Sequence, residues 1–230
     1  MKNHRLTVRL KTRGFAAVAV TVAAAVSAGT FVAAPAGAAV KEPTYRVELT
    51  SFTSFEETNE VGSDEIYATF DSTPDVGATQ SGRTNVVDNV DRYETHSWDP
   101  ARSVIWGSAN TGRSVGASGF NSVVTLWEHD NSDVDKIAGK VHSALRAVNG
   151  LLGDIPILSW ITKALSWVSG AVASIIGRNH DDLINKTVVH YDKVSLSAHL
   201  TKPGQSFKDV RILKGDGGKY AVWLKVTRVS

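Results

Sequence analysis

The stretch "FKDVRILKGDGGKYAVWLKVTRV", residues 207–229, contains two runs of alternating apolar and polar residues on either side of a glycine-rich turn. Alternation with a period of two is typical of a strand that buries one face. The sequence Gly-Asp-Gly-Gly supplies the backbone freedom that a tight turn needs. The stretch therefore predicts a β-hairpin joined at Gly215–Gly218.

Other short segments have the same character. "YRVELTSF" (45–52) alternates and places Tyr45, Val47 and Leu49 on one face. Four more are rich in β-branched and aromatic residues: "EIYATF" (65–70), "RSVIWG" (102–107), "SVVTLWEH" (122–129) and "TVVHYDKVSLSAHL" (187–200), the last long enough for two strands or one bent strand. The polar region 72–100 allows one strand near Val86–Tyr93. Seven or eight short strands with polar turns predict a mainly β fold, an antiparallel β-sandwich.

The first residues have the pattern of a secretory signal peptide. "MKNHRLTVRLKTRG" (1–14) is basic, "FAAVAVTVAAAVSAGTFVA" (15–33) is apolar, and "APAGAAV" (34–40) offers a small-residue cleavage site. We expect residues 1–39 to be this peptide and residues 40–230 to be the sandwich domain. The expected location is secreted and extracellular, and the Ala-rich leader is typical of a bacterial protein.

Charge and cysteine content limit the classes of partner. The chain is formally +2, and residues 1–39 contribute five positive charges and no negative one, so the remainder is −3. No basic patch is visible in the sequence, and we expect no nucleic acid partner. The chain has no Cys, which excludes a disulfide framework.

One region, about 136–178, departs from the β pattern. "DKIAGKVHSALRAVNG" (135–150) places Ile137, Val141, Leu145 and Val148 at helical spacing, and "ILSWITKALSWVSGAVASII" (157–176) continues that period. Pro156 suits a first helical turn and Gly177 suits a helix end. The sequence predicts an α-helical hairpin inserted into the sandwich.

Three roles are open for the second helix of this hairpin. It could pack on the sandwich, enter or lie on a bilayer, or dock a protein partner. About twenty-two helical residues span about 33 Å, close to the thickness of a bilayer core. The candidate membrane-binding or partner-binding residues are Leu158, Trp160, Ile161, Leu165, Trp167, Val168, Val172, Ile175 and Ile176.

Acidic residues flank the insertion. "EHDNSDVD" (128–135) precedes it and "NHDD" (179–182) follows it, while "EETNEVGSDE" (56–65) is a third acidic stretch. A helical hairpin would bring the first two together, and calcium prefers several carboxylate ligands on such loops. The alternative is that these acids serve ordinary turns, or that Asp133 or Asp135 caps the first helix.

At these residues a resemblance to a known family emerges. "GSDEIYATF" (62–70) resembles the S-D-P-Y-V-x-V strand start of the C2 domain, a calcium-dependent phospholipid-binding β-sandwich. "VVTLWEHDNSDVDKIAG" (123–139) and "NHDDLINKTVV" (179–189) resemble its acidic third loop. The resemblance covers 44–71, 121–139 and 179–200.

The resemblance implies a set of metal ligands and a bound calcium ion. By position in the motif these are Asp64 in the first loop and, in the third, Asp130 and Asp133 or Asp135 with Asp181 or Asp182, so all six are candidate ligands. Two departures from the family pattern are Glu65 in place of Pro and Asn185 in place of the closing Gly of the second fragment. A long insertion in the third loop is a further departure.

The sequence predicts a secreted protein that binds calcium and interacts with a membrane surface, and disruption of that membrane is compatible with the apolar hairpin. The expected partners are membrane lipid or the cell-envelope surface, and a protein partner through the hairpin is also compatible. The alternative is a non-catalytic structural or protein-interaction module of the cell envelope. No G-x-S-x-G, H-E-x-x-H or P-loop motif is present, so we do not expect an enzyme.

Overall fold

The computed structural model describes residues 41–74, 79–117, 119–130, 133–151, 166, 170 and 181–230. The expected signal peptide lies outside these ranges. Among the described residues, no helix is long and apolar enough to cross a membrane.

The hairpin predicted from residues 207–229 is confirmed. It consists of β9 (Ser206–Gly215) and β10 (Gly218–Arg228), which pair antiparallel without a break in register. Asp216 and Gly217 form the turn with positive φ angles of 50° and 79°. Two consecutive positive φ angles are the requirement of the type I′ turn, whose twist matches that of the flanking strands.

This hairpin is part of the first of two five-stranded antiparallel sheets. Sheet A has the order β5 (Thr95–Ser97), β1 (Tyr45–Glu56), β10 and β9, with β6 (Val104–Trp106) also paired to β1. β1 contains the predicted strand 45–52. Its alternation buries Tyr45, Val47 and Leu49 as expected.

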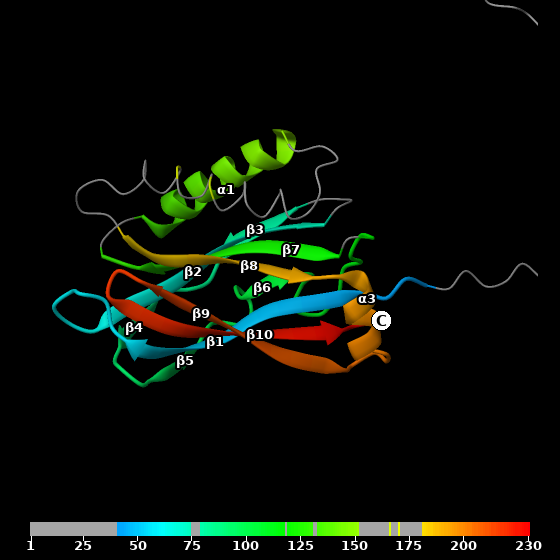
Figure 1. The fold of residues 1–230 in the computed structure, drawn as a ribbon, viewed down its shortest axis with the longest axis horizontal. Helices are drawn as coiled ribbons and strands as arrows, with labels where there is room; N and C mark the ends of the chain where they lie inside the picture. Colours follow the sequence, from blue (N-terminus) through cyan, green and yellow to red (C-terminus); the bar gives the residue numbers. More distant parts are fainter. Residues whose placement is uncertain are drawn as a thin grey trace, which may run out of the picture. The chain divides into compact units, whose positions relative to one another are not determined.

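Sheet B carries the remaining strands. Its order is β3 (Gln80–Arg83), β2 (Asp64–Pro74), β7 (Phe120–Glu128) and β8 (Asp182–Tyr191), with β4 (Val87–Val90) also paired to β2. The two sheets face each other (Figure 1). Their inner faces form one apolar core that includes Phe52, Ile66, Trp106 and Leu224. The mainly β sandwich is therefore confirmed.

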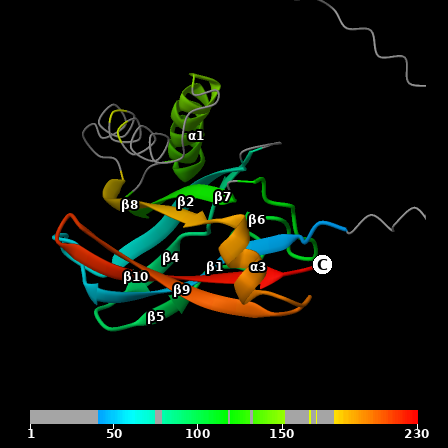
Figure 2. The ribbon, with the colours of Figure 1, turned by 45° about the vertical axis from the view of Figure 1, so that its right-hand side comes forward.

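A helix covers the outer face of sheet B (Figures 1 and 2). This is α1 (Val134–Leu151), which matches the first predicted helix. Ile137, Val141 and Leu145 are buried in a second cluster with Tyr67 and Trp127 of the sheet. Every residue of β7 is buried because the core lies on one side of it and α1 on the other.

The expectation for residues 187–200 needs a correction. Only the first part is a strand, β8, and the second part is α3 (Lys193–His199). The carboxylate of Asp192 accepts a hydrogen bond from the backbone N–H of Ser195 and so caps the helix. Leu196 and Leu200, four residues apart, are both buried in the core. His199, expected on a strand, therefore lies on a helix.

The inserted helical hairpin is not confirmed. Its second helix, predicted at 156–177, lies outside the described residues except for Ser166 and Gly170, which are helical and exposed. All nine apolar residues proposed for membrane or partner binding also lie outside. Their role stays a prediction.

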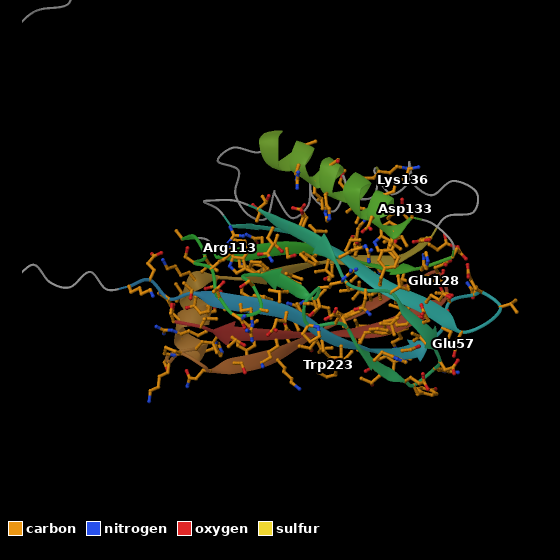
Figure 3. All side chains as sticks on the ribbon, turned by 180° about the vertical axis from the view of Figure 1, so that it is seen from behind. Glu57, Arg113, Glu128, Asp133, Lys136 and Trp223 are labelled. Atoms are coloured by element: carbon orange, nitrogen blue, oxygen red, sulfur yellow. The ribbon has the colours of Figure 1, made fainter. Side chains whose placement is uncertain are left out.

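Several described strand ends meet at one end of the sandwich. They are the ends of β1, β7 and β9 and the starts of β2, β8 and β10. Figure 3 shows Glu57 and Glu128 at this end, which we call the loop end. α3 and the C-terminus lie at the opposite end (Figure 1).

Candidate cation site

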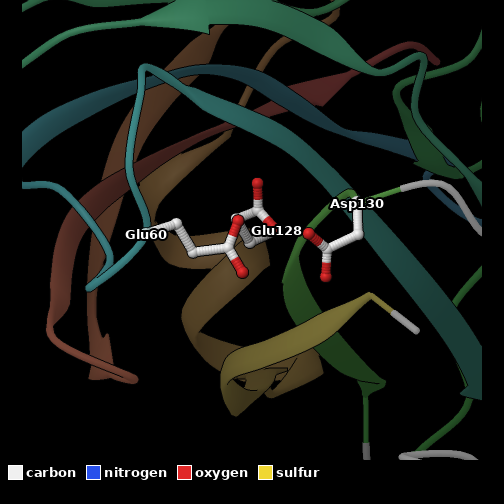
Figure 4. A group of neighbouring side chains, drawn as sticks. All are labelled: Glu60, Glu128 and Asp130. Atoms are coloured by element: carbon white, nitrogen blue, oxygen red, sulfur yellow. The ribbon is translucent and has the colours of Figure 1, made fainter. Parts of the chain in front are cut away.

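Three carboxylates meet at the loop end. One carboxylate oxygen from each of Glu60, Glu128 and Asp130 lies within 4.8 Å of the other two. Figure 4 shows Glu60 and Asp130 on either side of Glu128, with the carboxylate groups turned toward one another. We call these three residues the acidic cluster.

Glu128 is the buried member of the cluster. It is the last residue of β7, pairs with Asp182 of β8 and Ile66 of β2, and is only 3% exposed. Its Oε2 is buried and has no hydrogen-bond partner. A buried carboxylate oxygen without a partner is costly, and this one lies among other acids. These surroundings are therefore unfavourable for a negative charge on Glu128.

The pKa values of the cluster reflect burial and the closeness of the carboxylates. Burial, followed by the charges of Glu60 and Asp130, raises the pKa of Glu128 to about 8. Desolvation among the loops, followed by the charge of Asp130, raises the pKa of Glu60 to about 7. Taking up protons reduces the repulsion among these carboxylates.

Two further acids surround the cluster. Burial raises the pKa of Asp182, and so do the charges of Asp216, Asp130 and Asp181. Asp216 belongs to the β9–β10 turn and is exposed. The loop end therefore concentrates negative charge from both sheets, and Asp182 belongs to it as predicted from the sequence.

Asp64 lies at the same end, but its carboxylate is already satisfied. It is 2% exposed and accepts hydrogen bonds from the backbone N–H of Thr58 at 3.0 Å and the Thr58 hydroxyl at 2.8 Å. The Tyr220 hydroxyl also donates to it. Burial and this hydrogen bond raise the pKa of Tyr220. Asp64 anchors the loop that presents Glu60.

Asp181 has a similar supporting role. It is fully buried and accepts hydrogen bonds from the Tyr67 hydroxyl at 2.8 Å and the backbone N–H of Asp130 at 3.2 Å. Nδ1 of His129 lies 3.1 Å from its Oδ1. Asp181 therefore joins the chain on the two sides of the insertion, as the sequence predicted, and fixes the backbone of Asp130.

Asp133 and Asp135 are not brought into the cluster. Asp133 caps α1, because its Oδ1 accepts hydrogen bonds from the backbone N–H groups of Asp135 and Lys136 at 3.1 and 3.2 Å. Asp135 forms an ion pair with Arg83 at 2.6 Å, and this contact lowers the pKa of Asp135. The capping role is the alternative that the sequence left open.

Two exposed apolar groups lie at the loop end. Val61, next to Glu60, is fully exposed, and Tyr93 is 68% exposed in the connection after β4. The Arg92 guanidinium lies 4.7 Å from the Tyr93 ring centroid. The backbone N–H of Arg92 donates to Glu57 at 2.5 Å. This hydrogen bond ties the two connections together, so both side chains project at the loop end.

Comparisons with known proteins establish no family for this chain. No family model and no curated protein matches. Two structures of human GIVD cytosolic phospholipase A2, one with an inhibitor and terbium chloride, share 7% identity at TM-scores of 0.39 and 0.40, over 82% of this chain and 17% of that one. A structure of CC2D1B, titled for coordinating ESCRT-III activity, shares 11% identity at a TM-score of 0.36, over 83% and 56% of the two chains. Similarities this distant carry no argument about function.

Proposed function

We propose that this protein is an exported, non-catalytic β-sandwich that binds calcium at its loop end and attaches there to a membrane surface. The observation that supports the proposal best is the buried, unpartnered Oε2 of Glu128 between two other carboxylates. A bound divalent cation would supply a positive charge and a partner for this oxygen.

The chemistry of the donor set favours calcium. The acidic cluster offers only carboxylate oxygens, and Asp182 and Asp216 add two more acids nearby. Calcium takes six to eight oxygen ligands on flexible loops, whereas magnesium requires a stricter octahedron and keeps more of its water. Loops contributed by both sheets suit the larger ion.

The exposed residues at the loop end support attachment to a membrane. Val61 and Tyr93 expose apolar surface to solvent, and an aromatic ring with a polar end suits the bilayer interface. A bound calcium ion would offset the negative charge of the loops and allow anionic lipid headgroups to approach. Arg92, beside Tyr93, would add attraction to the same headgroups.

Calcium binding is tested by thermal unfolding of residues 40–230 in EDTA and in millimolar calcium. A ligand that binds only the folded state stabilises it by about 2.7 kcal/mol at a hundredfold excess over Kd, so we expect a rise of several degrees. The double variant Glu60→Gln/Asp130→Asn should lose this rise. Asp88→Asn, an exposed acid on β4 outside the cluster, is the matched control. An unchanged rise in the double variant would refute this site.

Membrane attachment is tested by sedimentation with vesicles of phosphatidylserine and phosphatidylcholine. We expect calcium-dependent binding that Val61→Asp/Tyr93→Ser weakens by about tenfold. Val194→Asp is the control, because Val194 is 79% exposed on α3 at the opposite end. Equal loss in both variants would exclude the loop end as the lipid contact.

The apolar segment 156–177 is tested separately. α1 is about 27 Å long at 1.5 Å per residue and must stay, because it packs on sheet B. Residues 152–180 are replaced with a Gly-Ser linker long enough to return to Asp182. Loss of dye leakage from vesicles, with the fold retained, would give this segment a membrane-disrupting role. Absence of vesicle binding and of any calcium effect in the intact protein would favour the alternative, a structural or interaction module of the cell envelope.

A further inference from the structure

The outer face of sheet A carries a second charged surface, of opposite sign to the loop end. Tyr220, Val222, Leu224 and Val226 of β10 are buried in the core. Because side chains alternate along a strand, the odd-numbered residues of β10 face outward. Figure 3 shows Trp223 on the side of the sandwich away from α1.

Register determines which residues share this face. Lys225 pairs with Lys208, Trp223 with Val210, and Lys219 with Lys214. Directly opposite residues in an antiparallel pair project on the same side. The face therefore has an apolar centre between two lysine pairs, which are about 20 Å apart for six residues at 3.3 Å each. We call it the basic face.

The two lysine pairs differ in the ion pairs that they form. Lys214 lies 3.7 Å from Glu56, and the Lys219 ammonium lies 5.7 Å from the Phe55 ring centroid. No described acid forms an ion pair with Lys208 or Lys225. Glu48, opposite Lys225 in β1, pairs instead with Arg46 at 3.0 Å. Like charges directly opposite one another destabilise a sheet, and an anion held between them would remove that cost.

The centre of the face offers contacts of a different kind. Ile212 and Val210 are 56% and 37% exposed, and Trp223 is half-buried beside them. The Trp223 indole N–H donates to the Thr53 hydroxyl at 3.4 Å, which helps to fix the ring. Thr53 in turn lies 2.9 Å from the Thr95 hydroxyl of β5. The region between the two lysine pairs therefore offers an aromatic ring, aliphatic side chains and threonine hydroxyls.

We propose that the basic face binds a linear acidic polysaccharide. Its sugar rings would lie on Trp223 and the neighbouring aliphatics, its hydroxyls would meet the threonines, and its carboxylates would contact Lys208 and Lys225. A bilayer fits less well. The face lies along the strands rather than at their ends, so a protein attached by its loop end does not lay this face on the same membrane.

The test uses fluorescent polygalacturonate as the probe, in EDTA, so that the calcium site does not contribute. We expect saturable binding that weakens steeply with ionic strength, because the Debye length falls from about 10 Å at 0.1 M to about 3 Å at 1 M. Lys208→Glu/Lys225→Glu should weaken binding at least about tenfold. Ile212→Asp should also weaken binding. Ile212 is exposed, so this substitution does not change the core.

The matched control is Lys136→Glu/Lys140→Glu. Both lysines are exposed on α1, and the change in net charge is the same. Figure 3 shows Lys136 on the opposite side of the sandwich from Trp223. Equal losses in the two double variants would overturn the proposal. Binding to a DNA oligonucleotide or to phosphatidylserine vesicles in EDTA that matches or exceeds binding to polygalacturonate would also overturn it.

Discussion

Asp64 and Asp130 lie at the same end of the sandwich but have different surroundings, so their substitution should have different effects. Asp64 is buried and accepts hydrogen bonds from Thr58 and Tyr220. Asp64→Ala removes the acceptor of several buried donors and should lower the free energy of unfolding by about 2–4 kcal/mol. Urea denaturation should show this loss in EDTA and in calcium alike.

Asp130→Asn should behave in the opposite way. It removes one charge from a repulsive cluster, so the free energy of unfolding in EDTA should change by less than about 0.5 kcal/mol or increase. The stabilisation by calcium should fall sharply. If Asp64→Ala removed the calcium effect without lowering stability in EDTA, our distinction between anchor and ligand would be wrong.

The acidic cluster should also make stability depend on pH. The pKa of Glu128 is about 8 in the folded protein against an ordinary value of 4.5. The folded state therefore binds more protons than the unfolded state, and its stability falls as pH rises from about 4.5 through about 8. Denaturation in EDTA should show this decline. Glu128→Gln stays neutral, so its free energy of unfolding should increase relative to that of the wild type as the pH rises.

Calcium provides the control for that prediction. A cation competes with protons for the same oxygens, so stability in calcium should decline less with pH or increase. An identical pH profile for the wild type and Glu128→Gln would show that Glu128 does not titrate in this range.

The residues of the site were only partly predictable. The sequence placed Asp130, Asp181 and Asp182 together because a helical insertion returns the chain to its starting point. It did not single out Glu60 as a member of the acidic cluster, although Glu60 lies in the acidic stretch 56–65. The local sequence identified Asp216 only as part of a turn. It does not show that the β9–β10 turn of sheet A lies near Asp182 of sheet B.

Among the elements, α1 contributes stability through three apolar residues that contact sheet B. Leu145 is 2% exposed, and Leu145→Ala should lower the free energy of unfolding by about 2–4 kcal/mol because it leaves a cavity. Lys140→Ala, at an exposed position of the same helix, should change it by less than about 0.5 kcal/mol. Urea denaturation of the two variants distinguishes a helix packed on the sheet from one that only lies near it.

The sequence predicted correctly whether a segment is a helix or a strand where its hydrophobic periodicity is strong. The β9–β10 hairpin and α1 each have several periods of one pattern, so the sequence identified both. Residues 192–200 alternate weakly, with Val194 and Leu196 separated by Ser195, and this suggested a strand. The Asp192 cap and the burial of both Leu196 and Leu200 favour α3 instead.

For the sandwich as a whole, the distribution of charge over the surface says more about possible binding partners than the net charge does. The sequence beyond residue 39 has a formal charge of −3 and shows no basic run. Folding nevertheless gathers Lys208, Lys214, Lys219 and Lys225 on one face. These lysines alternate with other residues along two strands, so only the register reveals their grouping. Glu60, Glu128 and Asp130 gather at the loop end.

Six residues of each strand separate the Lys208–Lys225 pair of the basic face from the Gly215–Gly218 pair at the β9–β10 turn of the loop end, so both surfaces should be occupied at once. Calcium would attach the loop end to a phosphatidylserine vesicle while the basic face stays accessible to polysaccharide. We expect fluorescent polygalacturonate to sediment with such vesicles only when protein and calcium are both present. Val61→Asp/Tyr93→Ser should abolish co-sedimentation without affecting binding of the polysaccharide in solution, and Lys208→Glu/Lys225→Glu should abolish it while the protein still sediments. Competition between vesicles and polysaccharide for the wild-type protein would instead mean that both use one surface.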